Sequence, residues 1–140
     1  MGKTEHSKPG IKIQKLQNMG DARGELFRIQ QSALDFLGSI HDIHFGTIKP
    51  NAIRGNHYHV RNFEVLIVGF ASRWKLVWSE SDSTITYERE FAGVGTILIE
   101  IEEGIVHAVH NTGNLPLNII SLSDHNYDPK YPDTIKKILV

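Results

Sequence analysis

The stretch RGNHYHVRNFE, residues 54–64, places two histidines one residue apart and a glutamate five positions after the second. Side chains alternate between the two faces of a β-strand, so His57 and His59 are expected to project to the same side, about 7 Å apart along the chain. Two such imidazoles can share one cation, because a metal–nitrogen bond is only about 2.0–2.1 Å long. On a strand this pair suits a metal site as well as it suits two ordinary histidines.

Glu64 follows VRN, a predicted turn that would bring its carboxylate back beside the two imidazoles. On the next strand Glu64 shares a face with Leu66 and Val68. A carboxylate within an apolar stripe is costly unless it is paired or binds a cation. We therefore expect Glu64 to be a ligand, although a buried salt bridge with Arg54 or Arg61 would meet the same need.

A second histidine-bearing segment, EEGIVHAVHN, spans residues 102–111. Its glycine predicts a turn, followed by a strand on which Ile105, His107 and Val109 face one way and His110 faces the other. His107 is the histidine with apolar neighbours, so it is predicted to point inward. Taken alone, an inward histidine is more often a hydrogen-bonded core residue than a metal ligand.

Alternation of apolar and polar residues predicts short strands along most of the chain, separated by Gly, Asn and Pro. One short helical turn is expected within 32–39, and the apolar C-terminal end is expected to dock on the body. Such a pattern is typical of an all-β fold, an antiparallel sandwich or jelly-roll barrel with little helix. The predicted strand segments are 11–16, 25–30, 40–48, 63–78 (two strands bent at Gly69), 83–91, 94–101, 104–111 and 115–124.

Composition limits the class of protein. The chain has 140 residues, a formal net charge of −1 and no cysteine, so nucleic-acid binding by charge, disulfides and thiolate chemistry are not expected. It lacks the roughly 20 consecutive apolar residues of a membrane span, and its polar start has no signal core. We expect a cytoplasmic protein with a flexible tail at 1–10 and a single domain at 11–140.

The two segments resemble the two motifs of the cupin superfamily. The first motif has HxH, three or four further residues and Glu, which the opening stretch matches. The second has Pro-x-Gly-x-x-His-x-x-x-Asn, which Gly104, His107 and Asn111 match in register. The resemblance implies a double-stranded β-helix, the cupin jelly roll, over roughly 40–125. It also implies these metal ligands: His57, His59, Glu64 and His107.

The motifs are not matched at every position. Asn51 stands where the first motif opens with Gly, and Gly69 comes two residues before the position of its closing Gly. Glu102 replaces the usual Pro of the second motif, and Gly95 lies one residue before its opening Gly. These departures concern turns and leave the four ligand positions intact.

Three narrower likenesses point to one substrate class. RGNHYH and the later NYDPKYPDT are similar to the C-terminal cupin domain of bifunctional capsular-polysaccharide enzymes, which epimerises a UDP-4-keto-6-deoxy amino sugar at C3 with zinc. DARGELF and RGNHYH resemble the metal-free dTDP-4-dehydrorhamnose 3,5-epimerases, whose base matches His57 and which have Gln in place of His59. Sugar 3,4-ketoisomerases have RG-x-HAH, which matches Arg54, Gly55 and both histidines. All three families act on 4-keto sugar nucleotides.

The resemblance thus implies an isomerase, an epimerase or ketoisomerase, that acts on a nucleotide-linked sugar in the biosynthesis of a surface polysaccharide such as a capsule. A divalent metal is the expected cofactor, with zinc preferred and iron, manganese or nickel as alternatives. A metal-bound imidazole cannot also take a proton, so a metal enzyme needs another base; the candidates are His44, Tyr58, Lys75, His110 and Tyr127. Without metal, His57 is the base by resemblance. The residues predicted to be catalytic are therefore His57, Tyr58, Lys75 and Tyr127.

Substrate contacts are assigned to Arg54, Asn56 and Trp74. The guanidinium of Arg54 can form paired hydrogen bonds with a diphosphate, and a salt bridge to a surface acid is the alternative. Trp74 shares a strand face with Trp78 and could stack on a base or sugar, or pack in the core or a dimer interface. A homodimer is expected, with 11–16 as the strand that hides an open edge.

Two other functions remain open at this point. Three histidines and one glutamate also suit a mononuclear iron or manganese oxygenase acting on a small molecule. Alternatively, the protein binds a sugar or another small ligand without catalysis. The bound metal and the fate of the ligand distinguish these alternatives.

Overall fold

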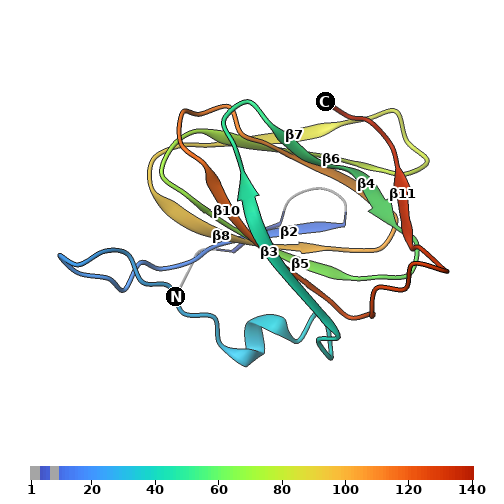
Figure 1. Ribbon diagram of the computed structural model, residues 1–140, viewed down its shortest axis with the longest axis horizontal. Coiled ribbons are helices and arrows are strands. Elements are labelled where there is room, and N and C mark those ends of the chain that lie inside the picture. The colour runs from blue at the N-terminus through green and yellow to red at the C-terminus, as the bar shows by residue number, and fades with distance from the viewer. Residues whose placement is uncertain (1–3, 7–9) are drawn as a thin grey trace.

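The computed structural model describes residues 4–6 and 10–140. In this part of the chain nearly all regular structure is β-strand (Figure 1). The elements are β1 (Thr4–His6), β2 (Ile11–Lys15), the 3-10 helix η1 (Gln31–Leu34), β3 (Asp42–Ile48), β4 (Ile53–His59), β5 (Glu64–Phe70), β6 (Trp74–Glu80), β7 (Tyr87–Phe91), β8 (Gly95–Ile101), β9 (Ile105–His110), β10 (Leu117–Ser123) and β11 (Thr134–Lys136).

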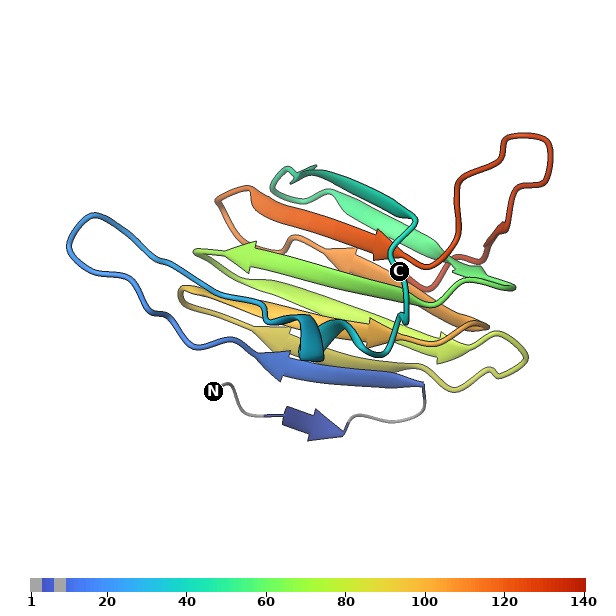
Figure 2. The same ribbon diagram turned by 90° about the horizontal axis from the view of Figure 1, so that it is seen from below.

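The strands form two facing sheets in which all neighbours are antiparallel (Figures 1 and 2). One sheet has the order β1-β2-β8-β5-β10-β3, and the other has the order β11-β4-β9-β6-β7. Neighbouring strands are mostly distant in sequence, as expected where the chain crosses repeatedly between sheets. The antiparallel all-β jelly roll expected from the sequence is confirmed.

The main core fills the space between the sheets. Trp74, Leu76 and Trp78 alternate along β6, so all three face inward, and none is more than 4% exposed. Trp74 stacks on Phe91 of β7 with 4.3 Å between ring centroids. Of the alternatives considered for Trp74, core packing is therefore correct, and its assignment to substrate binding is wrong because the indole is fully buried.

A second apolar cluster lies on the outer face of the six-stranded sheet. Val65, Ile67 and Leu98 face outward there and are covered by side chains of the segment that contains η1. The ribbon of this segment runs along the lower side of the molecule in Figure 1. The strand predicted at 25–30 is wrong, because this stretch has no strand partner. The stretch alternates with a period of two because Phe27 and Ile29 pack on the sheet, whereas Leu26, Arg28 and Gln30 are exposed to solvent.

The ends of the chain pair with different sheets. Of the tail predicted at 1–10, residues 1–3 and 7–9 lie outside the described residues, whereas Thr4–His6 forms β1 and pairs with β2. At the other end, β11 pairs with β4, so the predicted docking of the C-terminal segment is confirmed. The two strands predicted within 63–78 are present, but the chain turns at 71–73 rather than at Gly69. None of the described helices has the length and apolar character that crossing a membrane requires.

Candidate metal centre

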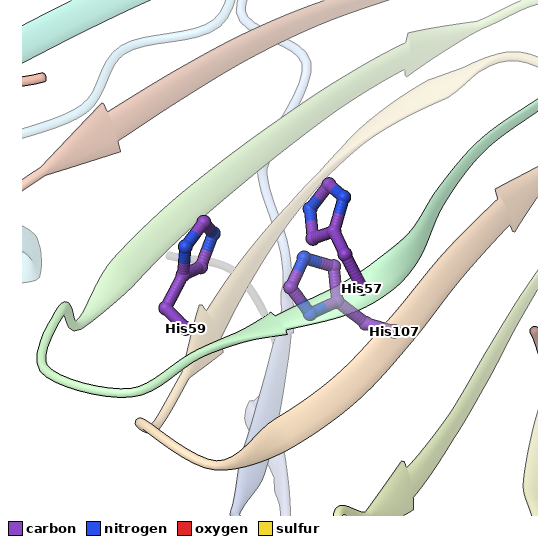
Figure 3. A group of neighbouring side chains, drawn as sticks. All are labelled: His57, His59 and His107. Atoms are coloured by element: carbon purple, nitrogen blue, oxygen red, sulfur yellow. The ribbon is translucent and has the colours of Figure 1, made fainter. Parts of the chain in front are cut away.

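Three histidines from two adjacent strands converge between the sheets (Figure 3). His57 and His59 project from the same side of β4, and His107 projects toward them from β9. One nitrogen of each ring lies within 4.8 Å of the corresponding nitrogens of the other two. Three imidazole nitrogens at such separations can reach one cation at a common point, given bonds of about 2.0–2.1 Å to zinc.

A β-bulge in β4 determines which side chains of the first motif share a face of the strand. Arg54 pairs with Val109 and Gly55 with Ala108, but the next paired residue is His57, opposite His107, so Asn56 is extra. A bulge resets the alternation of side chains, and it places Arg54 and His57 on the same face although they are three positions apart.

The Gly55-Asn56 pair makes this bulge. Gly55 has φ +106°, and a Cβ there would lie 2.5 Å from the carbonyl oxygen of His107. Asn56 has φ +56°, a left-handed conformation that Asn tolerates better than most residues. Gly55 is therefore required by the backbone next to the histidines, which accounts for the glycine of the Arg-Gly pair, and Asn56 suits the conformation that follows it.

Glu64 completes the group from the facing sheet. Its side chain is buried, and Oε2 accepts a hydrogen bond from the hydroxyl of Ser121. Oε1 lies 3.0 Å from Nε2 of His107 and 3.9 Å from Nε2 of His59. Among the described residues, Oε1 nevertheless has no hydrogen-bond partner of good geometry. A buried carboxylate oxygen that points toward three imidazoles and lacks a hydrogen bond is the environment of a metal ligand.

The charges at this centre depend on one another. Burial alone would raise the pKa of Glu64, but His107, His59 and Ser121 together lower it to about 2. Burial, followed by the charges of His107 and His59, lowers the pKa of His57 to about 4. Burial also lowers the pKa of His59, against the opposing effect of Glu64. For His107, Glu64 outweighs the effect of burial and raises the pKa. The centre thus favours an ionised glutamate and neutral His57 and His59, the forms that bind metal.

His107 and His59 each have a polar partner at Nδ1, the ring nitrogen turned away from Glu64, and these contacts are compatible with metal binding through Nε2. Nδ1 of His107 lies 3.0 Å from the carbonyl oxygen of Ile105, and a proton on Nδ1 leaves the Nε2 lone pair facing Glu64. Nδ1 of His59 lies 3.3 Å from Oγ1 of Thr134 on β11. Three nitrogens and one carboxylate oxygen, oriented in this way, fit zinc and also suit iron, manganese or nickel.

Two adjoining cavities meet at the candidate ligands. One of about 500 Å³ runs between the sheets along β4, and its walls include Arg54, His57 and His107. The other, of about 350 Å³, extends toward the loop before β11, and its walls include Tyr127. His44, His59, Glu64 and Thr134 line both cavities. Their combined volume is adequate for an extended small molecule.

Of the remaining residues predicted for the site, two line these cavities. Arg54 faces the larger one, and its Nε donates a hydrogen bond of 3.1 Å to the carbonyl oxygen of Thr47. Tyr127 lies on the rim of the smaller one with 75% of its surface exposed. Both side chains are therefore available to a ligand.

The structure does not bring the others to the cavities. Lys75 pairs in register with His110 on the outer face of the five-stranded sheet and forms a salt bridge of 3.3 Å with Glu88. Tyr58 alternates with the two histidines and pairs in register with Ile135, so it also faces away. These positions correct the assignments of Lys75 and Tyr58 as catalytic residues.

Asn56 is a structural residue rather than a substrate ligand. Its Nδ2 donates to the carbonyl oxygen of Val140 at 3.0 Å, and its Oδ1 accepts from the backbone N–H of Leu139 at 2.8 Å. The amide therefore holds the C-terminal segment against β4, which corrects its assignment to substrate binding.

Sequence reasoning missed the residues that support the ligands. Ser121 is a polar residue on the inward face of β10, Asp133 directly precedes β11, and Thr134 is the first residue of β11. The only signal for Ser121 is a serine at an inward position of an apolar strand. Asp133 and Thr134 end the stretch NYDPKYPDT, which the sequence marks only by a family likeness, and their place beside His59 follows from the pairing of β11 with β4.

Other motif residues shape the turns. Asn51, which replaces a glycine of the first motif, has φ +68° and so adopts the conformation that the glycine would supply. Gly104 has φ +77° at the turn before β9. Nδ2 of the buried Asn111 donates to the carbonyl oxygens of Ile48 and Leu115 at 2.9 and 2.8 Å. The departure at Asn51 therefore keeps the backbone conformation of the motif's glycine, and the matched residues Gly104 and Asn111 shape the turns on either side of β9.

Comparison with known proteins agrees with this fold. A family model described as polysaccharide biosynthesis C-terminal domain matches residues 19–135. The spore coat polysaccharide biosynthesis protein SpsL of Bacillus subtilis is 26% identical over 131 residues, which cover 89% of this chain and 85% of SpsL.

Solved structures of low sequence identity share the architecture. A dTDP-6-deoxy-D-glucose-3,5-epimerase from Legionella pneumophila, in complex with dTDP-4-keto-L-rhamnose, superimposes with a TM-score of 0.76 at 16% identity over 97% of this chain and 77% of the epimerase. The capsular polysaccharide assembling protein CapF of Staphylococcus aureus gives a TM-score of 0.64 at 16% identity over 99% of this chain and 35% of CapF. At these identities the likeness shows a common RmlC-like cupin fold.

Proposed function

Because the chain belongs to the polysaccharide biosynthesis C-terminal domain family, we propose that it is a metal-binding isomerase of surface-polysaccharide biosynthesis. Its proposed substrate is an NDP-4-keto-6-deoxy sugar, which it epimerises or converts by 3,4-ketoisomerisation. The polysaccharide role is supported by the description of the family and by the B. subtilis relative. The substrate class is supported by the keto sugar nucleotide in the complex of the L. pneumophila epimerase.

One observation carries the proposal. The buried Oε1 of Glu64, which has no well-formed hydrogen bond within the described structure, faces three converging imidazoles in a cavity large enough for a small molecule. An ion pair with His107 alone would leave the close approach of His57 and His59 without a chemical role. A divalent cation would use all four side chains.

Epimerisation or ketoisomerisation next to a ketone begins with loss of a weakly acidic C–H proton and formation of an enolate. This needs a base whose pKa lies near the working pH and positive charge near the ketone oxygen. A bound divalent metal with one open coordination position supplies that charge as a Lewis acid. The protein then has to bind the sugar nucleotide and accept the proton.

Residues around the centre can accept the proton and bind the sugar nucleotide. If the three histidines are metal ligands, the base must be another residue of the cavities. Of the predicted bases, His44 lines both cavities and Tyr127 lines the smaller one. His44 lies on β3, with 3.7 Å between its Nδ1 and Oδ2 of Asp42. Arg54 lies in the larger cavity with donors for a diphosphate.

Solvent exchange tests the reaction directly. The protein, loaded with zinc after removal of other metals, is incubated in D₂O with an NDP-4-keto-6-deoxy sugar, and NMR monitors deuterium at each ring carbon. Incorporation at C3 supports the proposal. His107→Gln should abolish deuterium exchange. The matched control is His41→Gln, which should leave exchange unchanged because His41 lies outside the cluster and contacts Ser39. No exchange at any carbon with several such sugars contradicts the isomerase, and unchanged but tightly bound sugar indicates a binding protein.

The donor set supports a second candidate. Three histidines and a glutamate suit iron or manganese as well as zinc, so an oxygenase acting on a small molecule uses the same centre. Elemental analysis of the purified protein separates the two functions. Iron together with oxygen consumption favours the oxygenase, and zinc with deuterium exchange favours the isomerase.

A further inference from the structure

Two aspartates hold the short turn that joins the ligand-bearing strands β4 and β5. Asp124 follows β10, and its Oδ1 accepts the backbone N–H of Phe63 at 3.0 Å. Asp133 precedes β11, and its carboxylate accepts the backbone N–H groups of Arg61 at 3.0 Å and Asn62 at 3.1 Å. Three consecutive amides between His59 and Glu64 thus depend on these two side chains.

Asp133 makes the larger share of these contacts. Its side chain is only 11% exposed, and it forms an ion pair of 3.3 Å with Nε of Arg61. Its backbone carbonyl also accepts the N–H of Val60 at 3.2 Å. A carboxylate that receives several hydrogen bonds within one turn restricts the backbone of that turn.

The same segment reaches the imidazole of His59. Oδ2 of Asp133 lies 3.9 Å from Nδ1 of His59, and Oγ1 of Thr134 lies 3.3 Å from the same nitrogen. The other nitrogen, Nε2, faces Glu64. Asp133 and Thr134 therefore contact the side of the His59 ring that is turned away from the metal centre.

We infer that Asp133 is a positioning residue of the metal centre, which fixes the turn between His59 and Glu64 and, with Thr134, orients the His59 ring. The inference rests on the metal site of the proposed function. When Nε2 of a neutral imidazole binds a cation, the ring proton must lie on Nδ1. A hydroxyl and a carboxylate beside Nδ1 stabilise that form and make Nε2 a stronger ligand.

This arrangement links the metal centre to the loop that borders the smaller cavity. The loop between Asp124 and Asp133 carries Tyr127 and Tyr131, and it extends beyond the sheets at the upper right of Figure 2. Both of its ends are attached to the turn between His59 and Glu64. The position of this loop is therefore coupled to the positions of His59 and Glu64.

The test measures zinc affinity and, separately, amide protection in metal-free protein. Asp133→Ala should weaken zinc binding about 10- to 100-fold, the usual effect of losing an outer-sphere partner. It should also speed hydrogen exchange at the amides of Arg61 and Asn62. Asp133→Asn keeps an acceptor oxygen for the turn but loses the charge beside His59, so it should retain more amide protection than Asp133→Ala while still weakening zinc binding.

The control is Asp128→Asn in the same loop, where Oδ1 accepts the N–H of Lys130 rather than an amide of the turn. It should leave zinc affinity and the exchange of both turn amides unchanged. A third variant, Thr134→Val, should weaken zinc binding without affecting the turn amides, which separates contact with the ring from support of the turn.

The outcomes distinguish this inference from the proposed function. If wild-type protein binds no metal, the metal site of the proposed function fails, and the positioning role fails with it even where the amides are protected. If zinc binds to the wild type, unchanged affinity in Asp133→Ala overturns the inference and leaves the metal site standing. Unprotected turn amides in metal-free wild-type protein overturn the role of Asp133 in the turn regardless of metal binding.

Discussion

Nε2 of His107 lies 3.0 Å from Oε1 of Glu64, and the two residues belong to different sheets. This buried contact connects β9 to β5 across the jelly roll, at the point where His57 and His59 also meet. The pair therefore contributes both to the attachment of the sheets and to the candidate metal centre, and substitutions can separate the two contributions.

Glu64→Gln keeps the size of the side chain and removes its charge. We expect zinc affinity to fall by more than tenfold, because an amide oxygen is a weaker ligand than a carboxylate. We also expect the metal-free protein to lose about 1–3 kcal/mol of unfolding free energy, since buried partners lose a charged acceptor. Titration calorimetry and urea denaturation measure the two effects.

The control for this substitution is Glu100→Gln. Glu100 belongs to the same sheet and forms a salt bridge of 3.7 Å with Lys12 on its outer face, away from the histidines. It should leave zinc affinity unchanged. Equal zinc affinity of Glu64→Gln and wild type would show that Glu64 is not a ligand.

Acid should destabilise the metal-free protein in two stages. Burial and positive neighbours lower the pKa of His57 from 6.5 to about 4, so between these values the unfolded chain binds a proton that the folded protein does not. Stability therefore falls as pH drops from 6.5 to 4. Despite burial, His107 and its neighbours lower the pKa of Glu64 from 4.5 to about 2, so its contribution, present above pH 4.5, is lost toward pH 2.

Thermal denaturation in a chelator between pH 8 and 2 measures these stages. The raised pKa of His107 has the opposite sign: its contribution is complete below pH 6.5 and decreases as pH rises through the higher folded-state value. His57→Gln should flatten the curve between pH 6.5 and 4 without removing the decrease below pH 4. A wild-type midpoint that is constant from pH 6.5 to 4 would contradict the burial of a neutral His57.

Gly55→Ala should disrupt the metal centre through the backbone alone. The position has φ +106°, and a new Cβ would meet the carbonyl oxygen of His107 at 2.5 Å. Positive φ in a non-glycine residue costs about 1–3 kcal/mol, to which the steric clash adds. We expect a lower denaturation midpoint and weaker zinc binding, because the bulge orients both Arg54 and His57.

Gly46→Ala on the edge strand β3 is the matched control. A Cβ at Gly46 meets no heavy atom within 4 Å, so this variant should bind zinc as the wild type does. If Gly55→Ala were as stable and as zinc-competent as Gly46→Ala, the bulge would not determine the site.

The fold and the converging side chains were predictable because both depend on local patterns. Alternation along a strand places Trp74, Leu76 and Trp78 on one face, and HxH spacing places the two histidines together. The failure at 25–30 has the same origin, since an extended segment that packs on a sheet alternates like a strand but pairs with none.

The support of the centre was not predictable, because it depends on pairing between distant segments. Asp133 reaches the turn after β4 only because β11 pairs with that strand, and the register of β11 has no local signal. Likewise, sequence alternation alone would put Arg54 and His57 on opposite faces, and only the bulge seen between β4 and β9 brings them together.

Arg54→Gln should weaken substrate binding more than turnover. Its guanidinium lines the larger cavity and would contact the diphosphate, a group that does not react. Losing a hydrogen bond to a charged group costs about 1.5–3 kcal/mol, so KM for the sugar nucleotide should rise at least about tenfold with little change in kcat. Arg73→Gln, in the turn before β6, is the control and should leave both constants unchanged. A KM equal to that of the wild type would remove Arg54 from the substrate site.

Trp74 should affect stability and not substrate binding. The indole is fully buried and stacks on Phe91, and among the described residues its Nε1 has no hydrogen-bond partner. Trp74→Ala should therefore cost about 3–5 kcal/mol of unfolding free energy, and Trp74→Phe should cost less because it keeps a ring beside Phe91 and loses no hydrogen bond. KM for the sugar nucleotide should be the same in Trp74→Phe and wild type, as steady-state kinetics can show. A raised KM in a stably folded Trp74→Phe protein would return this residue to the substrate site.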